Sequence, residues 1–166
     1  MSVSYKIPES VLVIIHTAEF EVLLIERADK AGYWQSVTGS KDTLDEPLTV
    51  TARREVEEET GIRTVDPDTN RALLAHEVPL ASLSDWNLAN TYEIYPVWRH
   101  RYAPGVVRNT EHVFSLQVPR SIVVMLSPRE HVAALWLPYH EAADKCFSPS
   151  NAEAILQLPQ HVRRTM

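Results

Sequence analysis

The sequence predicts an α/β fold in which helices flank a mixed β-sheet. Many short apolar runs have the pattern of strands, two helix patterns lie far apart along the chain, and several strands have the close spacing of hairpins. The chain has 166 residues, of which 45% are hydrophobic, an ordinary balance for a globular protein. This composition excludes a disordered or collagen-like chain, and the length favours a single domain over residues 1–166.

The strands are expected in the following order. Apolar runs at 11–17 and 21–25 are separated by three residues and form a hairpin, and a short strand follows at 34–38. Further strands are predicted at 73–78, 92–101, 111–118, 122–125 and 133–137.

Two helices are predicted, one in the first half of the chain and one near its end. The first spans residues 47–60, because Pro47 suits a first turn and Gly61 suits the left-handed residue that follows a helix. The second runs from 151 to 158, with Ser150 as its candidate N-cap.

Charge and cysteine content exclude several classes of protein. With 16 Lys and Arg against 22 Asp and Glu, the formal charge is −6, which argues against a nucleic-acid partner. The single cysteine, Cys146, excludes an internal disulfide framework and a zinc site built from cysteines alone, and it fits a reducing, cytoplasmic location. The aliphatic run at 11–15 is too short to span a membrane and no basic segment precedes it, so neither a membrane partner nor a signal peptide is expected.

The acidic stretch inside the first helix is the most informative part of the sequence. At about 100° per residue, Glu55, Glu58 and Glu59 fall at i, i+3 and i+4 and share one narrow arc. Like charges at this spacing repel, and a divalent cation such as Mg²⁺ or Mn²⁺ would compensate them, because hard cations prefer carboxylate oxygens. Arg54 lies one turn before Glu58 and can pair with it.

A solvated acidic face is the alternative interpretation of these glutamates, because such faces are common on helices. The glutamates border an apolar stripe, formed by Leu48, Ala52 and Val56, that should face the core. This places them at the edge of a groove and favours the metal-binding interpretation.

A second charged cluster surrounds a predicted turn at 104–105. Arg99, Arg101 and Arg108 flank this turn and can bind phosphate oxygens through paired hydrogen bonds, although a hairpin tip with ordinary surface arginines is the alternative. Glu111 begins the next strand pattern, either as an edge charge or as a carboxylate delivered to the metal cluster.

The stretch from Arg54 to Ile62 resembles the second half of the Nudix signature, in which Arg-Glu-apolar is followed by Glu-Glu and then by Gly-apolar. The matching residues are Arg54, Glu55, Val56, Glu58, Glu59, Gly61 and Ile62. Gly39 matches the glycine that opens the signature, but six residues separate it from Glu46, one more than in the family. Glu46, in preference to Asp45 at the nominal position, is then the loop acid that can approach a metal.

This resemblance implies an α/β/α sandwich with a mixed sheet, and a loop–helix–loop catalytic box over residues 39–62. It also implies a hydrolase of nucleoside diphosphates linked to another moiety, which uses Mg²⁺, with Mn²⁺ as an alternative. Glu55 and Glu59 look like metal ligands in the box, and Glu58 shares their face as a ligand or general base.

Segments outside the box are similar to the branch of the family that acts on dihydroneopterin triphosphate. Matches at 5–6, 34–40 and 99–111 extend the resemblance along most of the chain, and they make Glu111 the metal-associated acid beyond the box. The positions that look like substrate contacts are Lys6, Arg27 and Thr38. The implied reaction is attack of water on the α-phosphorus, which gives dihydroneopterin monophosphate and pyrophosphate on the way to folate.

Other substrates and roles stay open at this point. A house-cleaning pyrophosphohydrolase acting mainly on dATP or a damaged nucleotide, an RNA-decapping enzyme, and a non-catalytic Nudix module that binds a nucleotide are the alternatives. The presence of Glu55, Glu58 and Glu59 disfavours the non-catalytic module, and the net acidity disfavours RNA. The expected partner is therefore a small pterin or nucleoside triphosphate.

Ring-bearing side chains give weaker signals. Trp34 and Tyr102 are candidates to stack on a pterin or purine ring. Six histidines show no metal-ligand spacing and are expected to be structural or exposed: His16, His76, His112, His131, His140 and His161.

Overall fold

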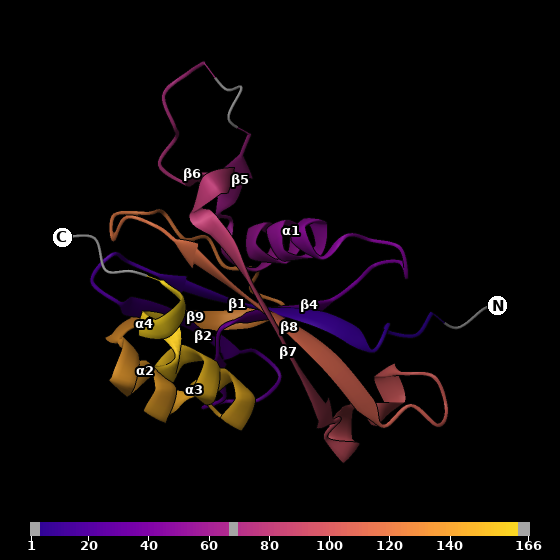
Figure 1. Ribbon diagram of the computed structural model, residues 1–166. Helices are drawn as coiled ribbons and strands as arrows, with labels where there is room; N and C mark the ends of the chain where they lie inside the picture. Colours follow the sequence, from indigo (N-terminus) through magenta and orange to yellow (C-terminus); the bar gives the residue numbers. More distant parts are fainter. Residues whose placement is uncertain (1–3, 67–69, 163–166) are drawn as a thin grey trace.

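The computed structural model describes residues 4–66 and 70–162 (Figure 1). The strands are β1 (Glu9–His16), β2 (Glu21–Arg27), β3 (Trp34–Gln35), β4 (Val37–Ser40), β5 (Arg63–Val65), β6 (Glu77–Pro79), β7 (Leu83–Glu93), β8 (Arg108–Gln117) and β9 (His131–Pro138). The helices are α1 (Leu48–Thr60), α2 (Tyr139–Lys145), α3 (Pro149–Leu156) and α4 (Leu158–His161), with short 3₁₀ helices η1 (Leu80–Ser82) and η2 (Pro96–Arg101). Across the described residues, no helix is long and apolar enough to cross a membrane.

The main sheet is mixed, which confirms the predicted fold class. β1 pairs antiparallel with β2 and β4 and parallel with β8, while β7 pairs antiparallel with β8. β2 also pairs antiparallel with β3 and β9, and β5 and β6 form a separate parallel pair. Helix α1 lies on one face of the main sheet, and α2, α3 and α4 lie on the other (Figure 1). The result is an α/β/α sandwich.

The two faces of β1 supply two separate apolar cores, because successive side chains of a strand point to opposite faces. Val11 and Val13 are fully buried and pack in the same cluster as Val56 of α1. Leu12 belongs to the other cluster, together with Ile155 of α3. The apolar stripe predicted for the first helix therefore faces the sheet.

Residues 39–62 adopt the expected loop–helix–loop form around α1. Gly39 of β4 stands opposite Val11 of β1, so the box begins on a strand that pairs with the central strand of the sheet. Helix α1 follows Pro47 and ends at Gly61, which has a φ of 73° and donates its N–H to the carbonyl of Glu57 at 2.9 Å. Glycine adopts this left-handed conformation at little cost, and the predicted helix end is confirmed.

The predicted strand at 92–101 is wrong. Strand β7 covers Leu83–Glu93, and the chain then enters η2, which begins at Pro96. Proline has no N–H to donate to a neighbouring strand, so Pro96 was the local signal that the strand pattern could not continue.

The predicted strand at 122–125 is also absent from the described structure. The N–H of Val123 donates to the carbonyl of Ala75, and the N–H of Met125 donates to the carbonyl of Thr60 at the end of α1. This irregular segment therefore packs against the C-terminal end of α1 through single hydrogen bonds and forms no strand pairing. The strand predicted at 73–78 is limited to β6, which begins at Glu77.

The remaining differences lie at element ends and between elements. The run at 34–38 is divided at Ser36, because the chain changes partner from β2 to β1 and Ser36 donates its N–H to Asn151 Oδ1 at 2.8 Å. The last predicted helix begins at Pro149, with Ser148 rather than Ser150 as its N-cap residue, and Leu158 starts the separate helix α4. Helix α2 was not predicted.

Candidate active site

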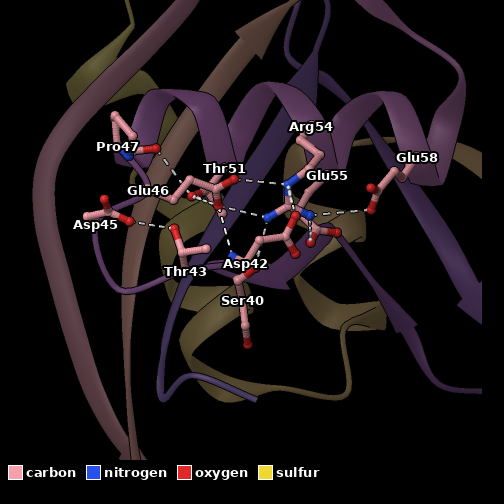
Figure 2. Close-up of polar contacts among 10 residues, drawn as sticks. All are labelled: Ser40, Asp42, Thr43, Asp45, Glu46, Pro47, Thr51, Arg54, Glu55 and Glu58. Atoms are coloured by element: carbon pink, nitrogen blue, oxygen red, sulfur yellow. Dashed lines mark hydrogen bonds and ion pairs between the residues drawn. The ribbon is translucent and has the colours of Figure 1, made fainter. Parts of the chain in front are cut away.

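Arg54 is the centre of a polar network at the start of the box (Figure 2). Its guanidinium group donates to Glu46 Oε1 at 2.9 Å, to Glu55 Oε1 at 2.8 Å and to the carbonyl of Ser40 at 3.0 Å. The predicted pairing with Glu58 is present at 3.5 Å. One arginine therefore links the loop, the end of β4 and two of the three glutamates.

Glu46 is bound to this arginine and does not face the other acids. Both of its carboxylate oxygens accept hydrogen bonds from Arg54, and Oε1 also accepts one from the hydroxyl of Thr51 at 2.6 Å. These bonds, those from Arg54 first, lower the pKa of Glu46 to about 2. Asp45 accepts a hydrogen bond from Thr43 instead. Neither Glu46 nor Asp45 lines the cleft that holds the other predicted acids, so the structure gives no support to a metal contact from this loop.

Glu55 and Glu59 form a close, buried carboxylate pair. Glu59 is 2% exposed, and burial and the Glu55 carboxylate raise its pKa well above the usual value. Burial also raises the pKa of Glu55, against the lowering effect of Arg54. Glu58 differs, because its side chain is 54% exposed. The three glutamates share one face as predicted, but only two of them share a desolvated environment.

Gly39 allows the Glu55 carboxylate to approach the sheet. A Cβ atom built at Gly39 would overlap the carboxyl group of Glu55. The opening glycine of the box is therefore required by close approach and not by its backbone conformation.

The carboxylate pair has the properties of a binding site for a hard cation. Glu59 Oε1 is buried and has no hydrogen-bond partner among the described residues. Leaving such an oxygen unpaired is costly, and a divalent cation would pair it and screen the repulsion from Glu55. Within residues 4–66 and 70–162, no group of three or more His, Cys, Asp or Glu side chains converges into a complete cage. The protein can therefore supply part of a coordination shell, which leaves positions for water and a ligand.

Glu111 of β8 contributes a further buried carboxylate, and it is 4% exposed. The hydroxyls of Tyr92 and Ser150 lie 3.5 Å and 3.4 Å from its two oxygens. Burial raises the pKa of Glu111 to about 7, although these hydroxyls and that of Thr38 act in the opposite direction. The carboxylate of Glu111 is therefore not a simple edge charge.

One cleft of about 1060 Å³ collects most of the predicted site residues. The acidic ones that line it are Glu55, Glu58, Glu59 and Glu111. The other predicted residues that line it are Lys6, Arg27, Thr38, Arg54 and Arg101. Glu46, Arg99 and Arg108 do not line it.

The arginine-rich segment is only partly used in this cleft. Arg101 lines the cleft and lies 3.5 Å from Asp29, whereas Arg99 donates its Nε–H to the carbonyl of Ile94 at 3.0 Å. Arg108 is exposed at the start of β8. Of the three arginines, only Arg101 lines the cleft in this structure, so the expected phosphate contact of the segment rests on Arg101.

A chain of polar contacts that the sequence did not reveal runs along one wall of the cleft. Arg27 is held by Asp29 through two 2.8 Å hydrogen bonds, and its Nη1 donates to Gln35 Oε1 at 3.3 Å. The amide nitrogen of Gln35 then lies 3.3 Å from His131 Nε2, which is 3.7 Å from Glu59 Oε1. Burial and the Arg27 charge lower the pKa of His131 to about 4, so its ring is neutral.

His131 was expected to be merely structural or exposed, and Gln35 carried no signal at all. Both residues reach the cleft because β3 and β9 pair with opposite sides of β2, which puts Gln35 next to Ile25 and His131 next to Arg27. No pattern within one strand predicts such a contact.

Of the two aromatic residues expected to stack on a substrate ring, one lines the cleft and the other does not. Tyr102 lines the cleft. Trp34 does not, since it packs against the core cluster under α2 and α3 and carries Lys145 over its ring at 5.4 Å. Five further aromatic residues line the cleft: Tyr5, Tyr92, Tyr95, Trp98 and Phe147. The sequence did not single out Tyr95, Trp98 or Phe147.

Comparison with known proteins agrees with this geometry. A family model described as the NUDIX domain matches residues 6–158. Dihydroneopterin triphosphate diphosphatase of Escherichia coli (strain K12) is 39% identical over 154 residues, which cover 92% of this chain and 93% of that protein. The protein of the same name from Haemophilus influenzae is 33% identical over 165 residues, covering 99% of this chain and 95% of its own.

A solved structure, that of the E. coli dihydroneopterin triphosphate pyrophosphohydrolase, superposes with a TM-score of 0.78. It is 34% identical, and the match covers 96% of this chain and 100% of that chain. The chain therefore belongs to the Nudix hydrolase family, whose members act on phosphoric anhydrides of small molecules and generally need divalent metal ions.

Proposed function

We propose that this protein hydrolyses dihydroneopterin triphosphate to dihydroneopterin monophosphate and pyrophosphate. The observation that carries the proposal is the buried Glu55–Glu59 pair, which shares its cleft with the cationic side chains of Lys6, Arg27 and Arg101. This combination suits a substrate whose phosphate chain binds together with a divalent cation. Two relatives that carry the name dihydroneopterin triphosphate diphosphatase align with 92% and 99% of the chain, which supports the choice of substrate.

We assign the cation to Glu55 and Glu59, with Glu111 as the acid that approaches it from β8, and we expect Mg²⁺, with Mn²⁺ able to replace it. Such an ion neutralises phosphate charge and makes a bound water more acidic. Carboxylate oxygens suit both ions, and the unpartnered oxygen of Glu59 is the atom most in need of a ligand.

The protein's own cations bind and orient the phosphate chain. Arg27 keeps N–H groups to spare beyond its bonds to Asp29 and Gln35, because a guanidinium group has five. Lys6 and Arg101 lie on the same side, since the N–H of Lys6 donates to the carbonyl of Arg101 at 2.8 Å. Thr38 lines the same cleft, and its hydroxyl donates to the carbonyl of Val11 at 3.0 Å.

Two carboxylates are available to accept the proton of the attacking water. Glu58 is half exposed at the cleft and is oriented by Arg54, whereas Glu111 is buried beside two hydroxyls. We assign the general base to this pair, and a comparison of kcat for Glu58→Gln and Glu111→Gln identifies the member responsible. The true base should lose kcat by at least about a hundredfold with little change in KM.

Hydrolysis in H₂¹⁸O tests the proposed reaction directly. Attack at the α-phosphorus places the label in dihydroneopterin monophosphate and leaves the pyrophosphate unlabelled. Label found only in pyrophosphate would mean attack at the β-phosphorus, and orthophosphate as the first product would refute the proposal. Side-by-side kinetics with dATP separate this function from nucleotide house-cleaning, because kcat/KM ranks the two substrates.

A further inference from the structure

Three aromatic rings that line the cleft contact one another. Tyr95 and Trp98 meet edge to face, with ring centroids 5.4 Å apart, and Phe147 lies 6.3 Å and 6.1 Å from them. Phe147 also packs against Tyr33, outside the cleft, with ring centroids 4.7 Å apart. Tyr95 immediately precedes η2, Trp98 lies within it, and Phe147 follows α2. We call these three residues the aromatic cluster. They line a cleft that otherwise presents many charged and hydroxyl-bearing side chains.

Core packing does not account for the aromatic cluster. None of its three residues belongs to either hydrophobic core, and Tyr95 is 43% exposed. Aromatic side chains in water give up the favourable burial that such large apolar surfaces can gain. A ligand surface that covers them would recover this free energy.

Arg27 joins the aromatic cluster to the carboxylate pair. Its guanidinium group lies over the Trp98 ring at 4.6 Å from the centroid. The same guanidinium group lies 3.3 Å from Gln35, and Gln35 lies 3.3 Å from His131. His131 in turn lies 3.7 Å from Glu59, so these contacts lead from Trp98 to the buried acids. The cleft is therefore apolar and aromatic on one side of Arg27, and acidic and able to bind a cation on the other.

We propose that the aromatic cluster binds the planar heteroaromatic ring of the substrate, with Trp98 and Phe147 as its main contacts. The phosphate chain then extends past Arg27 towards Glu59. The identity of this ring as a pterin rests on the proposed function, whereas the placement of a ring on these side chains follows from the cleft itself. Stacking against aromatic side chains has a strong geometric preference and tolerates different bicyclic rings.

The test separates the ring from the phosphate chain. Trp98→Leu and Phe147→Leu are each measured for the KM of dihydroneopterin triphosphate and for the inhibition constant of inorganic tripolyphosphate, at fixed Mg²⁺. Tripolyphosphate carries the phosphate chain without a ring. We expect KM to rise about tenfold in each variant while the inhibition constant changes by less than about twofold.

Tyr139→Leu is the matched control, because Tyr139 packs against Phe20 outside the cleft and its replacement should leave both constants unchanged. An equal rise of both constants in the Trp98 and Phe147 variants would overturn the proposal, since it would mean disturbed phosphate binding. Unchanged constants in both variants would overturn it as well.

The same comparison made with dATP keeps this test independent of the pterin. A protein that hydrolyses only dATP would refute the proposed function. A selective rise of its KM for dATP in the two variants would still support ring binding at the aromatic cluster.

Discussion

The acidic face of α1 and the arginine-rich segment at 99–111 both concentrate charge of one sign, but only the helix keeps its charges together. Glu55 and Glu59 are buried side by side in the cleft. Arg99, Arg101 and Arg108 separate, one to a backbone carbonyl, one to the cleft and one to solvent. Charges of one sign converge only where the backbone forces them to and where an opposite charge compensates them.

The backbone explains this difference. A helix advances by a constant angle, so residues at i and i+4 share a face whatever surrounds them. The segment around Pro104 combines a 3₁₀ helix, a turn and the start of β8. The three arginines there have different surroundings: Arg101 lies near the distant Asp29, Arg99 bonds the nearby carbonyl of Ile94, and Arg108 is exposed. Arg54, by contrast, supplies the compensating charge from within the same helix as the glutamates.

The largest expected effect tests the convergence of the acids. Glu59→Gln should reduce Mg²⁺-dependent turnover by at least about a hundredfold, because a neutral amide cannot replace a charged ligand of the cation. Its melting temperature in EDTA should not fall, since the change removes a buried charge that burial and Glu55 disfavour. Glu57→Gln, on the exposed side of the same helix, should leave turnover unchanged. Near-normal turnover of the Glu59 variant would refute the metal assignment.

A smaller loss of turnover is expected from a substitution in β4, the strand that the Glu55 carboxyl group approaches. Gly39→Ala places a methyl group where the Glu55 carboxyl group lies. We expect Glu55 to move, with at least about a tenfold loss of kcat and a weaker affinity for Mn²⁺ by EPR titration. Urea unfolding should change little, because a flexible side chain can shift to make room. Unaltered Mn²⁺ affinity would show that Glu55 is not a ligand.

Replacing arginines of the 99–111 segment should have moderate and unequal effects on KM. Arg101→Ala should raise KM about tenfold, because a charge-assisted hydrogen bond to phosphate contributes about 1.5–3 kcal/mol. Arg101→Lys should recover only part of this loss, since it lacks the planar fork of the guanidinium group. Arg108→Ala should leave steady-state kinetics within about twofold of the parent protein. Equal KM increases for Arg101→Ala and Arg108→Ala would contradict the division of roles made here.

The smallest expected effect concerns the loop acid that turned away from the cleft. Glu46 has its pKa lowered to about 2 by Arg54, which is below the value it has in the unfolded chain. Its charged form therefore stabilises the fold above about pH 4.5, and this contribution is lost as the pH falls towards 2. Urea unfolding of the parent protein and of Glu46→Gln should differ most near neutral pH and converge in acid. A difference that stays constant between pH 7 and pH 3 would contradict the ion pair with Arg54.

Much of the fold and of the acidic site followed from local rules. Helix α1 was predicted from Pro47 and Gly61 at its ends, and the shared face of Glu55 and Glu59 followed from helical periodicity. The mixed sheet followed from apolar runs and short connections, whereas η2, α2 and the true extent of β7 did not. Pro96 was a local signal that the strand pattern ends before η2. The first part of β7 gave no such signal, because it is a mixed polar run with a bulge and shows no clear alternation of polar and apolar residues.

What only the tertiary structure decided is the set of contacts between elements. The sequence allowed Glu46 to approach a metal or to pair with Arg54, and the structure shows the pairing with Arg54. Gln35 and His131 meet at the cleft because two strands pair with opposite sides of β2. Sequence by itself determined which side chains share a helix face, since that depends on one repeating angle. It could not determine which side chains meet across elements, since that depends on the packing of the whole chain.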